Sequence, residues 1–463
     1  MIISCLALGS RGDVEPLLAL AEGLLLKESL QDLSVRIACR NEIWNDLASC
    51  SPPLPQVSHF PIRSCSVDMA VALHAERRSQ EPPSKAVGRE DVKRFEEEER
   101  AELLQACHGA DVIVCNLFTL EGFHISEKMR IPCVIVSPCL PPNRMPATFE
   151  RQFMDEFPLL YRKLKASARG LEDEDALSRP VCWSDVTAWM WRVFLDDHGT
   201  WREQCLGLPA IPLDKFEEEG GEPLPQAPLL LLTVSQRLLA LDESDQFLAW
   251  KSCARFVGNQ VRESSKSVEL DKELMSFLSS SHSLQAGDRV ETSAPSRTVC
   301  VCFGSMPSLG FLESAEEKDV DSAEAFLVTI MRGLKSLNLR CVWMLQGFHP
   351  TIKSKLERAA GACVHHHFFT FVAHPHALIL PHCFAMIHHG GAGSVAAAIR
   401  HGCMHIVFPL TFDQIYWAVL LERAGLACRA QPWRSVTDES IKSSLQFAMD
   451  HYDIRLAMKG GQS

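Results

Sequence analysis

The amino-acid sequence predicts an α/β protein built from two halves. Its 463 residues exceed what one hydrophobic core usually serves, so more than one domain is expected. Near the start, the apolar run 2–8 is followed by the glycine loop 9–13 and then by apolar residues at helical spacing. The same order of strand, glycine loop and helix returns at 384–401. A glycine loop at the carboxyl end of a strand is typical of ligand-binding α/β folds.

Short apolar runs predict the remaining strands of the first half. They lie at 35–39, 111–115 and 133–137, and a helix ending at Arg130 separates the last two. Residues 149–208 carry a helical pattern that contains several tryptophans. We interpret these tryptophans as core packing, with an apolar ligand pocket or contact with a membrane surface as alternatives.

The second half repeats the alternation of strands and helices more regularly. Expected strands cover 299–303, 341–345, 384–388 and 406–408, and Gly402 marks the end of the helix after the second glycine loop. An acidic stretch with glycine and proline at 215–223 is typical of a linker. We therefore predict a first domain at 1–212, a linker at 213–228, a second domain at 229–440 and a C-terminal helix or tail at 441–463.

Composition and charge exclude several classes of protein. A formal net charge of -12 disfavours a nucleic-acid partner, because such binding depends on neutralising phosphates with Lys and Arg. The eighteen cysteines are scattered through a long chain, which favours reduced, buried thiols over a disulfide framework. The first apolar run is too short for a signal peptide, and no apolar stretch reaches 18 residues. A cytoplasmic location is expected, with peripheral contact at a membrane surface as an open alternative.

The glycine loop 389–394 predicts a diphosphate site. Glycines allow a ligand to approach the backbone closely, and the following helix presents unpaired N–H groups and a positive dipole end. His389 and Ser394 add side-chain donors. The spacing is neither GxGxxG nor GxxxxGK[ST], so a nicotinamide cofactor and a P-loop nucleotide are both disfavoured. A tight turn that serves only packing is the alternative.

Asp413 and Gln414 follow the next expected strand and predict a sugar site. A carboxylate beside an amide offers both acceptors and donors to sugar hydroxyls. The alternative is that Asp413 only caps the helix expected at 415–422. The segment 375–381, which contains His376, is expected to be a loop that lies against a nucleobase.

These motifs resemble, in their order along the chain, family-1-type glycosyltransferases of the GT-B fold. The segments 9–16, 142–146 and 201–209 are similar to the opening loop, a proline motif and a helix ending in Leu-Gly-Leu-Pro of that family. The turn 303–306, the segment 375–381, the glycine loop and the Asp413-Gln414 pair complete a set that spans nearly the whole chain. The resemblance is greatest to sterol 3-beta-glucosyltransferases and bacterial antibiotic glycosyltransferases.

The resemblance implies two Rossmann-like domains that face each other across a cleft, with the donor in the second domain. The reaction would be an inverting transfer of a hexose, glucose in the first instance, from a UDP-sugar to the hydroxyl of a sterol or other lipid-like acceptor. No cofactor and no metal would be required. Asp13 would be the general base, in an opening loop that also contains Gly9, Ser10, Arg11 and Gly12. The donor-binding residues would be Gly304, Ser305, His376, His389, Gly390, Gly391, Gly393, Ser394, Asp413 and Gln414.

Some positions depart from the family pattern and keep alternatives open. Ser394 replaces a common threonine, and Ala397 stands where plant enzymes carry a ribose-binding glutamate, which weakens the choice of UDP over TDP. The acceptor could instead be a polyketide or other secondary metabolite. A catalytically silent relative that binds a nucleotide sugar or a lipid, and a nucleotide-sugar epimerase, are further alternatives. The histidines at 365–389 do not have the ligand spacing of a zinc site.

Overall fold

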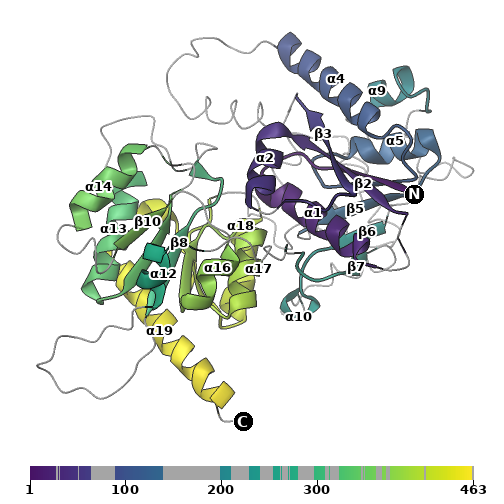
Figure 1. Ribbon diagram of the computed structural model, residues 1–463. Coiled ribbons are helices and arrows are strands. Elements are labelled where there is room, and N and C mark those ends of the chain that lie inside the picture. Colours follow the sequence, from purple (N-terminus) through teal and green to yellow (C-terminus); the bar gives the residue numbers. More distant parts are fainter. Residues whose placement is uncertain are drawn as a thin grey trace, which may run out of the picture.

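The computed structural model contains two parallel β-sheets with helices packed against them, arranged as two neighbouring units (Figure 1). The first unit is coloured purple to teal and the second teal to yellow. The residues that the structure describes are 1–27, 30, 32–50, 52–63, 89–138, 199–209, 229–239, 254–260, 262, 270, 272–279, 297–307, 312, 323–345, 348, 350–360, 368–371, 376–410 and 413–460.

The first unit is built on a seven-stranded sheet in the order β3-β2-β1-β4-β5-β6-β7, with every pairing parallel. Strand order reverses between β1 and β4, so the loops that follow these two strands lie at a topological switch point, where ligands bind in open α/β sheets. The strands are β1 Ile2–Leu6, β2 Ser34–Arg40, β3 Val57–Ile62, β4 Val112–Cys115, β5 Cys133–Ser137, β6 Leu229–Leu232 and β7 Ala254–Phe256.

Helices of the first unit bury one apolar face each. In α1, Val14, Leu17, Leu18 and Ala21 are buried at the spacing that the sequence predicts for a helix packed on a sheet. The expected stop at Arg130 is confirmed, because this residue caps α5 in the left-handed conformation with a φ of 56°. The helices are α1 Arg11–Leu25, α2 Asn41–Cys50, α4 Arg89–Ala106, α5 Glu121–Met129, α9 Gly199–Gln204 and α10 Gln236–Leu239.

The predicted domain boundary at 229 is wrong. The strand β6 pairs with β5 in parallel, with Val134 opposite Leu229, and β7 pairs with β6. The first unit therefore extends at least to Phe256. Farther along, the Arg262 guanidinium binds both carboxylate oxygens of Glu22 on α1, at 2.7 and 3.0 Å, which ties residue 262 to the same unit. The predicted linker 213–228 and most of the predicted helical region 149–208 lie outside the described residues.

The second unit is built on a five-stranded parallel sheet in the order β10-β9-β8-β11-β12. Its order reverses between β8 and β11, which places the turn after β8 beside the glycine loop after β11. The strands are β8 Thr298–Cys302, β9 Arg340–Met344, β10 Phe368–Phe371, β11 Ala385–His388 and β12 Met404–Val407. The helices are α12 Lys272–Ser279, α13 Ala323–Ser336, α14 Pro350–Ala360, α16 His376–Ile379, α17 Ala392–His401, α18 Gln414–Arg423 and α19 Asp438–Gly460, with 3₁₀ turns η6 Leu380–His382 and η7 Trp433–Ser435.

Two further expectations concern the second unit. The segment expected to be a loop at 375–381 is helical from His376, because it forms α16 and the turn η6. The C-terminal helix expected at 441–463 is α19, which begins at Asp438 and packs along α13 and β12. A Cβ at Gly333 of α13 would lie 2.2 Å from Ile441 Cγ2, so the two helices approach at a glycine. The stop at Gly402 is confirmed, with a φ of 74°.

Candidate functional site

The loop after β11 requires glycine at position 390. Gly390 has a φ of 92°, a conformation that side chains disfavour. A Cβ there would also lie 2.9 Å from the Gln414 carbonyl oxygen and 2.9 Å from Val407 Cγ1. The loop is thus packed against the beginning of α18 and the end of β12, and its backbone path is fixed.

The glycine loop leads directly into α17. Gly391 is the N-cap residue, so the N–H groups of Ala392, Gly393 and Ser394 lie in the first turn, where no carbonyl of the same helix can accept from them. A Cβ at Gly393 would meet nothing within 4 Å, whereas the Ser394 side chain is buried. The helix therefore presents donors and the positive end of its dipole beside open space, an arrangement that suits an anion.

The imidazole ring of His389 lies in a slot between two glycines. A Cβ at Gly391 would come within 2.4 Å of His389 Nε2, and a Cβ at Gly304 within 3.1 Å of Cε1. The ring is buried, and its Nδ1 has no hydrogen-bond partner among the described residues. Burial lowers the pKa of His389 from 6.5 to about 4, with a further contribution from His376. The ring is therefore neutral at physiological pH and can offer one N–H to a ligand.

Asp413 and Gln414 begin α18, and internal contacts hold both side chains. The Trp417 indole Nε1–H donates to Asp413 Oδ2 at 2.7 Å, and Asp413 makes no side-chain capping bond to the helix. Capping of α18 therefore does not explain why a carboxylate is present at position 413. Gln414 is buried; its Oε1 accepts from the Leu410 N–H at 2.7 Å and its Nε2 contacts Met306 Sδ at 3.3 Å.

Trp417 was not among the residues that we predicted from the sequence. Its position four residues after Asp413 on an expected helix was the available signal, because side chains at i and i+4 lie on one face. The Gln414 contacts join the loop after β12 to the turn after β8, which contains Gly304 and Ser305. The second unit thus holds the predicted donor-binding segments together.

The opening loop after β1 holds the Asp13 carboxylate. The Ser10 N–H donates to Asp13 Oδ2 at 2.7 Å, as in the capping box at the start of α1. The Ser10 hydroxyl donates to the same oxygen at 2.9 Å. Gly9, with a φ of 109°, provides the space, since a Cβ there would lie 2.6 Å from Oδ2. Both Ser10 bonds reach Oδ2 and neither reaches Oδ1.

The environment of Asp13 makes it a stronger base than an ordinary aspartate. Burial raises the pKa of Asp13 from 3.8 to about 6; the Ser10 hydrogen bonds oppose this rise and the Asp413 carboxylate adds to it. The effect of Asp413 means that the opening loop of the first unit lies within electrostatic range of α18 of the second. A carboxylate with a pKa near 6 is ionised at neutral pH and can accept a proton from a bound hydroxyl.

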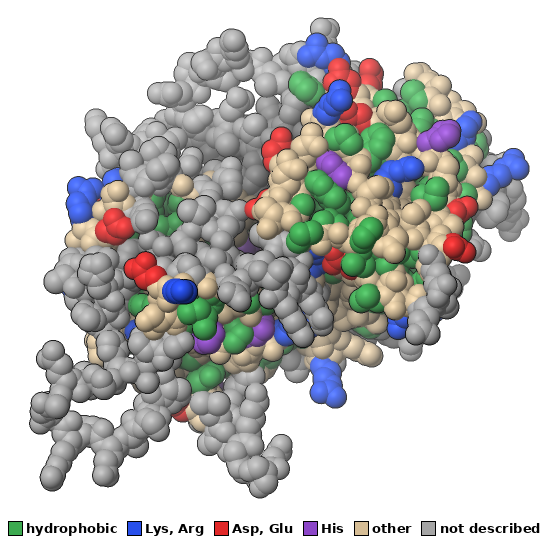
Figure 2. All heavy atoms as spheres, viewed as in Figure 1, with side chains coloured by type: hydrophobic (Ala, Val, Ile, Leu, Met, Phe, Trp, Pro, Cys, Tyr) green, Lys and Arg blue, Asp and Glu red, His purple; other side chains and the backbone are tan. Residues whose placement is uncertain are grey.

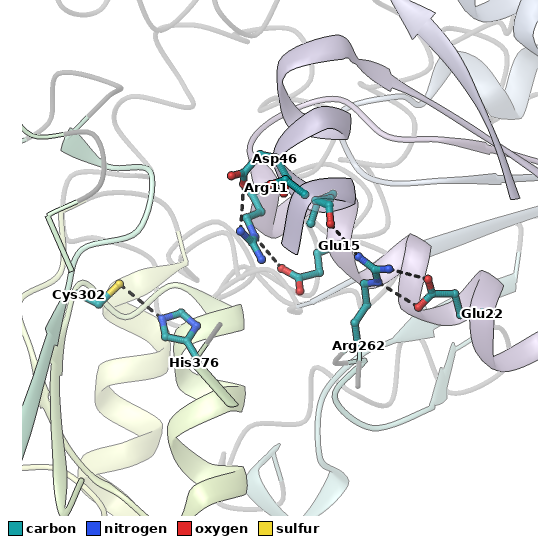
Figure 3. Close-up of polar contacts among 9 residues, drawn as sticks. Arg11, Glu15, Glu22, Asp46, Arg262, Cys302 and His376 are labelled. Carbon is teal, nitrogen blue, oxygen red and sulfur yellow. Dashed lines mark hydrogen bonds and ion pairs between the residues drawn. The ribbon is translucent and has the colours of Figure 1, made fainter. Parts of the chain in front are cut away.

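Other residues of α1 also face the second unit. Figure 3 shows Arg11 and Glu15 on the side of α1 toward His376 and Cys302. Burial lowers the pKa of His376 from 6.5 to about 4, against an opposing effect of Glu15 and with a smaller lowering by Arg11. The His376 Nε2 lies 3.5 Å from Cys302 Sγ. Arg11 forms ion pairs with Glu15 and Asp46, both at 3.0 Å, so its guanidinium is oriented within the first unit.

The described residues contain no group of three or more His, Cys, Asp or Glu side chains that could hold a metal ion. In the view of Figure 2, Lys and Arg side chains are interspersed with Asp and Glu on the described surface, and they do not gather into a basic patch there. Among the described helices, none has both the length and the apolar composition needed to cross a membrane.

The fold is that of the GT-B glycosyltransferases. The glycotransferase of kitacinnamycin superposes with a TM-score of 0.56 at 16% identity, over 96% of this chain and 90% of that structure. A UDP-glucose: anthocyanidin 3-O-glucosyltransferase, solved in complex with UDP, also gives 0.56, at 12% identity over 98% of this chain and 93% of that structure. These similarities confirm the predicted pair of Rossmann-like sheets.

Sequence comparison identifies one matching family and several individual relatives. Residues 369–458 match the family described as Erythromycin biosynthesis protein CIII-like, C-terminal domain. A sterol 3-beta-glucosyltransferase of Leptosphaeria maculans is 23% identical over 428 residues, and one of Yarrowia lipolytica is 22% identical over 425; each match covers 92% of this chain. The chain spans about a quarter of the length of these curated relatives. The resemblance to sterol glucosyltransferases and antibiotic glycosyltransferases is therefore confirmed.

Proposed function

We propose that the protein is an inverting glycosyltransferase that moves a hexose, glucose in the first instance, from a UDP-sugar to the hydroxyl of a sterol or other lipid-like acceptor. The observation that carries the proposal is the position of Asp13, a carboxylate with a raised pKa, within electrostatic range of Asp413 beside the glycine loop. A base and an anion site on opposite units provide what a single-displacement transfer needs.

In the proposed reaction, the acceptor hydroxyl donates its proton to Asp13 as its oxygen attacks the anomeric carbon. Asp13 Oδ2 is held by Ser10, so Oδ1 is the oxygen that would accept the proton. The new carbon–oxygen bond forms on one face of the sugar while the bond to the diphosphate breaks on the other, and UDP leaves with the bonding electrons. General base catalysis of this kind contributes about 10²–10⁴-fold.

The leaving diphosphate gains negative charge, and the second unit offers fixed donors for it. The proposal assigns this role to the first-turn N–H groups of α17, the Ser394 hydroxyl and the neutral ring of His389, with Gly304 and Ser305 on the opposite side. One preorganised donor can be worth about 3–4 kcal/mol in the transition state. No metal ion takes part in this scheme.

In the same scheme, Asp413 binds sugar hydroxyls and His376 lies near the nucleobase. Trp417 holds one Asp413 oxygen in place. Gln414 would reach a sugar hydroxyl by exchanging its weak contact with the Met306 sulfur for a stronger bond. The proposal places the protein in the cytoplasm, with peripheral contact at a membrane surface where the acceptor is a membrane sterol.

The test is to incubate the protein with UDP-glucose and a panel of sterols, following UDP release and detecting glycosylated sterol by mass spectrometry. Asp13→Asn is the matched control, because the amide keeps the shape of the carboxylate and cannot act as the base. We expect product that depends on UDP-glucose with the wild-type chain and none with the variant. Turnover of Asp13→Asn at the wild-type rate would remove Asp13 from the mechanism.

The same assay separates the alternatives. The similarity of residues 369–458 to the erythromycin biosynthesis family favours a polyketide as the second class of acceptor, so a macrolide belongs in the panel. Product with the macrolide and none with a sterol would overturn the acceptor proposed. Binding of UDP-glucose without any transfer would indicate a silent sensor, and absence of nucleotide-sugar binding would reject the proposal as a whole.

A further inference from the structure

A pair of buried histidines lies directly behind the glycine loop. His388 is the last residue of β11, and His405 lies on the neighbouring strand β12. Both side chains are fully buried, and the His388 Nε2 lies 3.0 Å from the His405 Nδ1. The register places His405 opposite Met386, so the two rings meet diagonally across adjacent strands. Neither residue belongs to the donor-binding set described above.

The backbone fixes the direction of the hydrogen bonds in this pair. The Gly390 N–H donates to His388 Nδ1 at 3.0 Å. Because an amide can only donate, Nδ1 carries no proton, and the neutral ring must carry its proton on Nε2. That proton is then donated to His405 Nδ1. Burial, together with the neighbouring histidines, holds the pKa of His388 well below its usual value, which agrees with a neutral ring.

The consequence for the loop is that one of its N–H groups is directed away from the open side. The Gly390 N–H is directed inward to His388, while the first-turn groups of α17 remain available. Gly390 also has the positive φ that turns the chain. If this N–H lost its acceptor, it would be a buried donor without a partner, a state that favours another path for the loop.

We propose that His388, oriented by His405, is a positioning residue that sets the shape of the diphosphate site. The inference rests on the proposed function, because it concerns the affinity of that site for a nucleotide diphosphate. His388 does not touch the ligand. It acts through Gly390 on the two neighbouring positions, His389 and Gly391. The His389 side chain and the Gly391 Cα must keep their relative positions for the His389 ring to occupy its slot.

The experiment measures UDP binding by calorimetry for the wild-type chain, His388→Asn and His388→Leu. The asparagine Oδ1 can accept the Gly390 N–H in place of Nδ1, whereas leucine removes the acceptor and keeps an apolar side chain. We expect His388→Asn to bind within about threefold of the wild type, and His388→Leu to lose about tenfold or more.

A control variant separates positioning from general loss of stability. Leu445→Ala on α19 removes a fully buried side chain in the same unit, at a place that has no contact with the loop in the described contacts. It should lower the unfolding temperature and leave the UDP affinity unchanged. If His388→Leu binds UDP as tightly as Leu445→Ala, the inference is overturned. If the wild-type chain itself does not bind UDP, the proposed function fails instead.

Discussion

Replacing Asp13 by asparagine should abolish transfer and stabilise the fold at the same time. The pKa of Asp13 rises from 3.8 to about 6 on folding, so the folded chain holds the proton more tightly than the unfolded chain. The contribution of protonated Asp13 to the free energy of unfolding is fully present below about pH 3.8 and is lost as the pH rises through about 6. Ionised Asp13 therefore destabilises the native state at neutral pH.

The size of the effect follows from the shift. At about 1.36 kcal/mol per pKa unit, ionisation costs the folded chain about 3 kcal/mol at pH 7.5 and about half of that at pH 5.0. Asparagine does not ionise, and its oxygen can still accept from Ser10. The variant should gain up to this amount, less what solvent screening removes, since Asp13 is only partly buried.

The assay is thermal unfolding by calorimetry at pH 7.5 and pH 5.0, reading the transition of the first unit. A gain of this size should raise that transition by several degrees at pH 7.5 and by clearly less at pH 5.0. Asp32→Asn, at an exposed carboxylate, is the control and should leave the unfolding temperature unchanged at both pH values. Equal gains at both pH values, or a loss of stability, would refute the reasoning about burial.

Three further predictions concern the site. First, the value of kcat/KM should fall about tenfold per pH unit below about pH 6, because Asp13 must be ionised to act as the base; a profile that stays flat down to pH 5 would contradict this. Second, Trp417→Phe keeps an aromatic ring and removes the hydrogen bond to Asp413. The value of kcat/KM for UDP-glucose should therefore fall about tenfold or more, with little change in UDP affinity. An equal loss of UDP affinity would indicate general disruption of the site. Third, Gly391→Ala should displace the His389 ring and weaken UDP binding about tenfold or more. The control Gly23→Ala, in open space on α1, should bind UDP normally and gain about 0.5–1 kcal/mol of stability. Unchanged UDP binding by Gly391→Ala would show that the His389 ring does not need its slot.

The sequence predicts those parts of the structure that depend on local pattern. Glycine loops after apolar runs identified both the Asp13 loop and the His389 loop, because each consists of a strand end, a turn that needs glycine and a helix start. The stop at Gly402 depends equally on local chemistry. In each case the determining residues lie within one short segment.

Features that depend on distant partners were missed. Nothing in the local sequence of β6 shows that this strand pairs with β5 and so belongs to the first unit. The strand β3 was overlooked because Ser58, His59 and Pro61 interrupt its apolar pattern. The contact of Gln414 with Met306, 108 residues away, likewise requires the folded chain.

Among the described residues, the hydrogen bonds that hold the Asp13 carboxylate all come from Ser10, three residues away, in a space that Gly9 provides. The proposed base is therefore oriented by a neighbour in its own loop, at the start of α1. Under the proposed function, this local support would let the acceptor-binding loops diversify, by evolution or by design, while the Ser10 bonds keep Asp13 oriented. Exchanging acceptor loops between relatives of this fold would then change which alcohol is bound and leave the means of activating it in place.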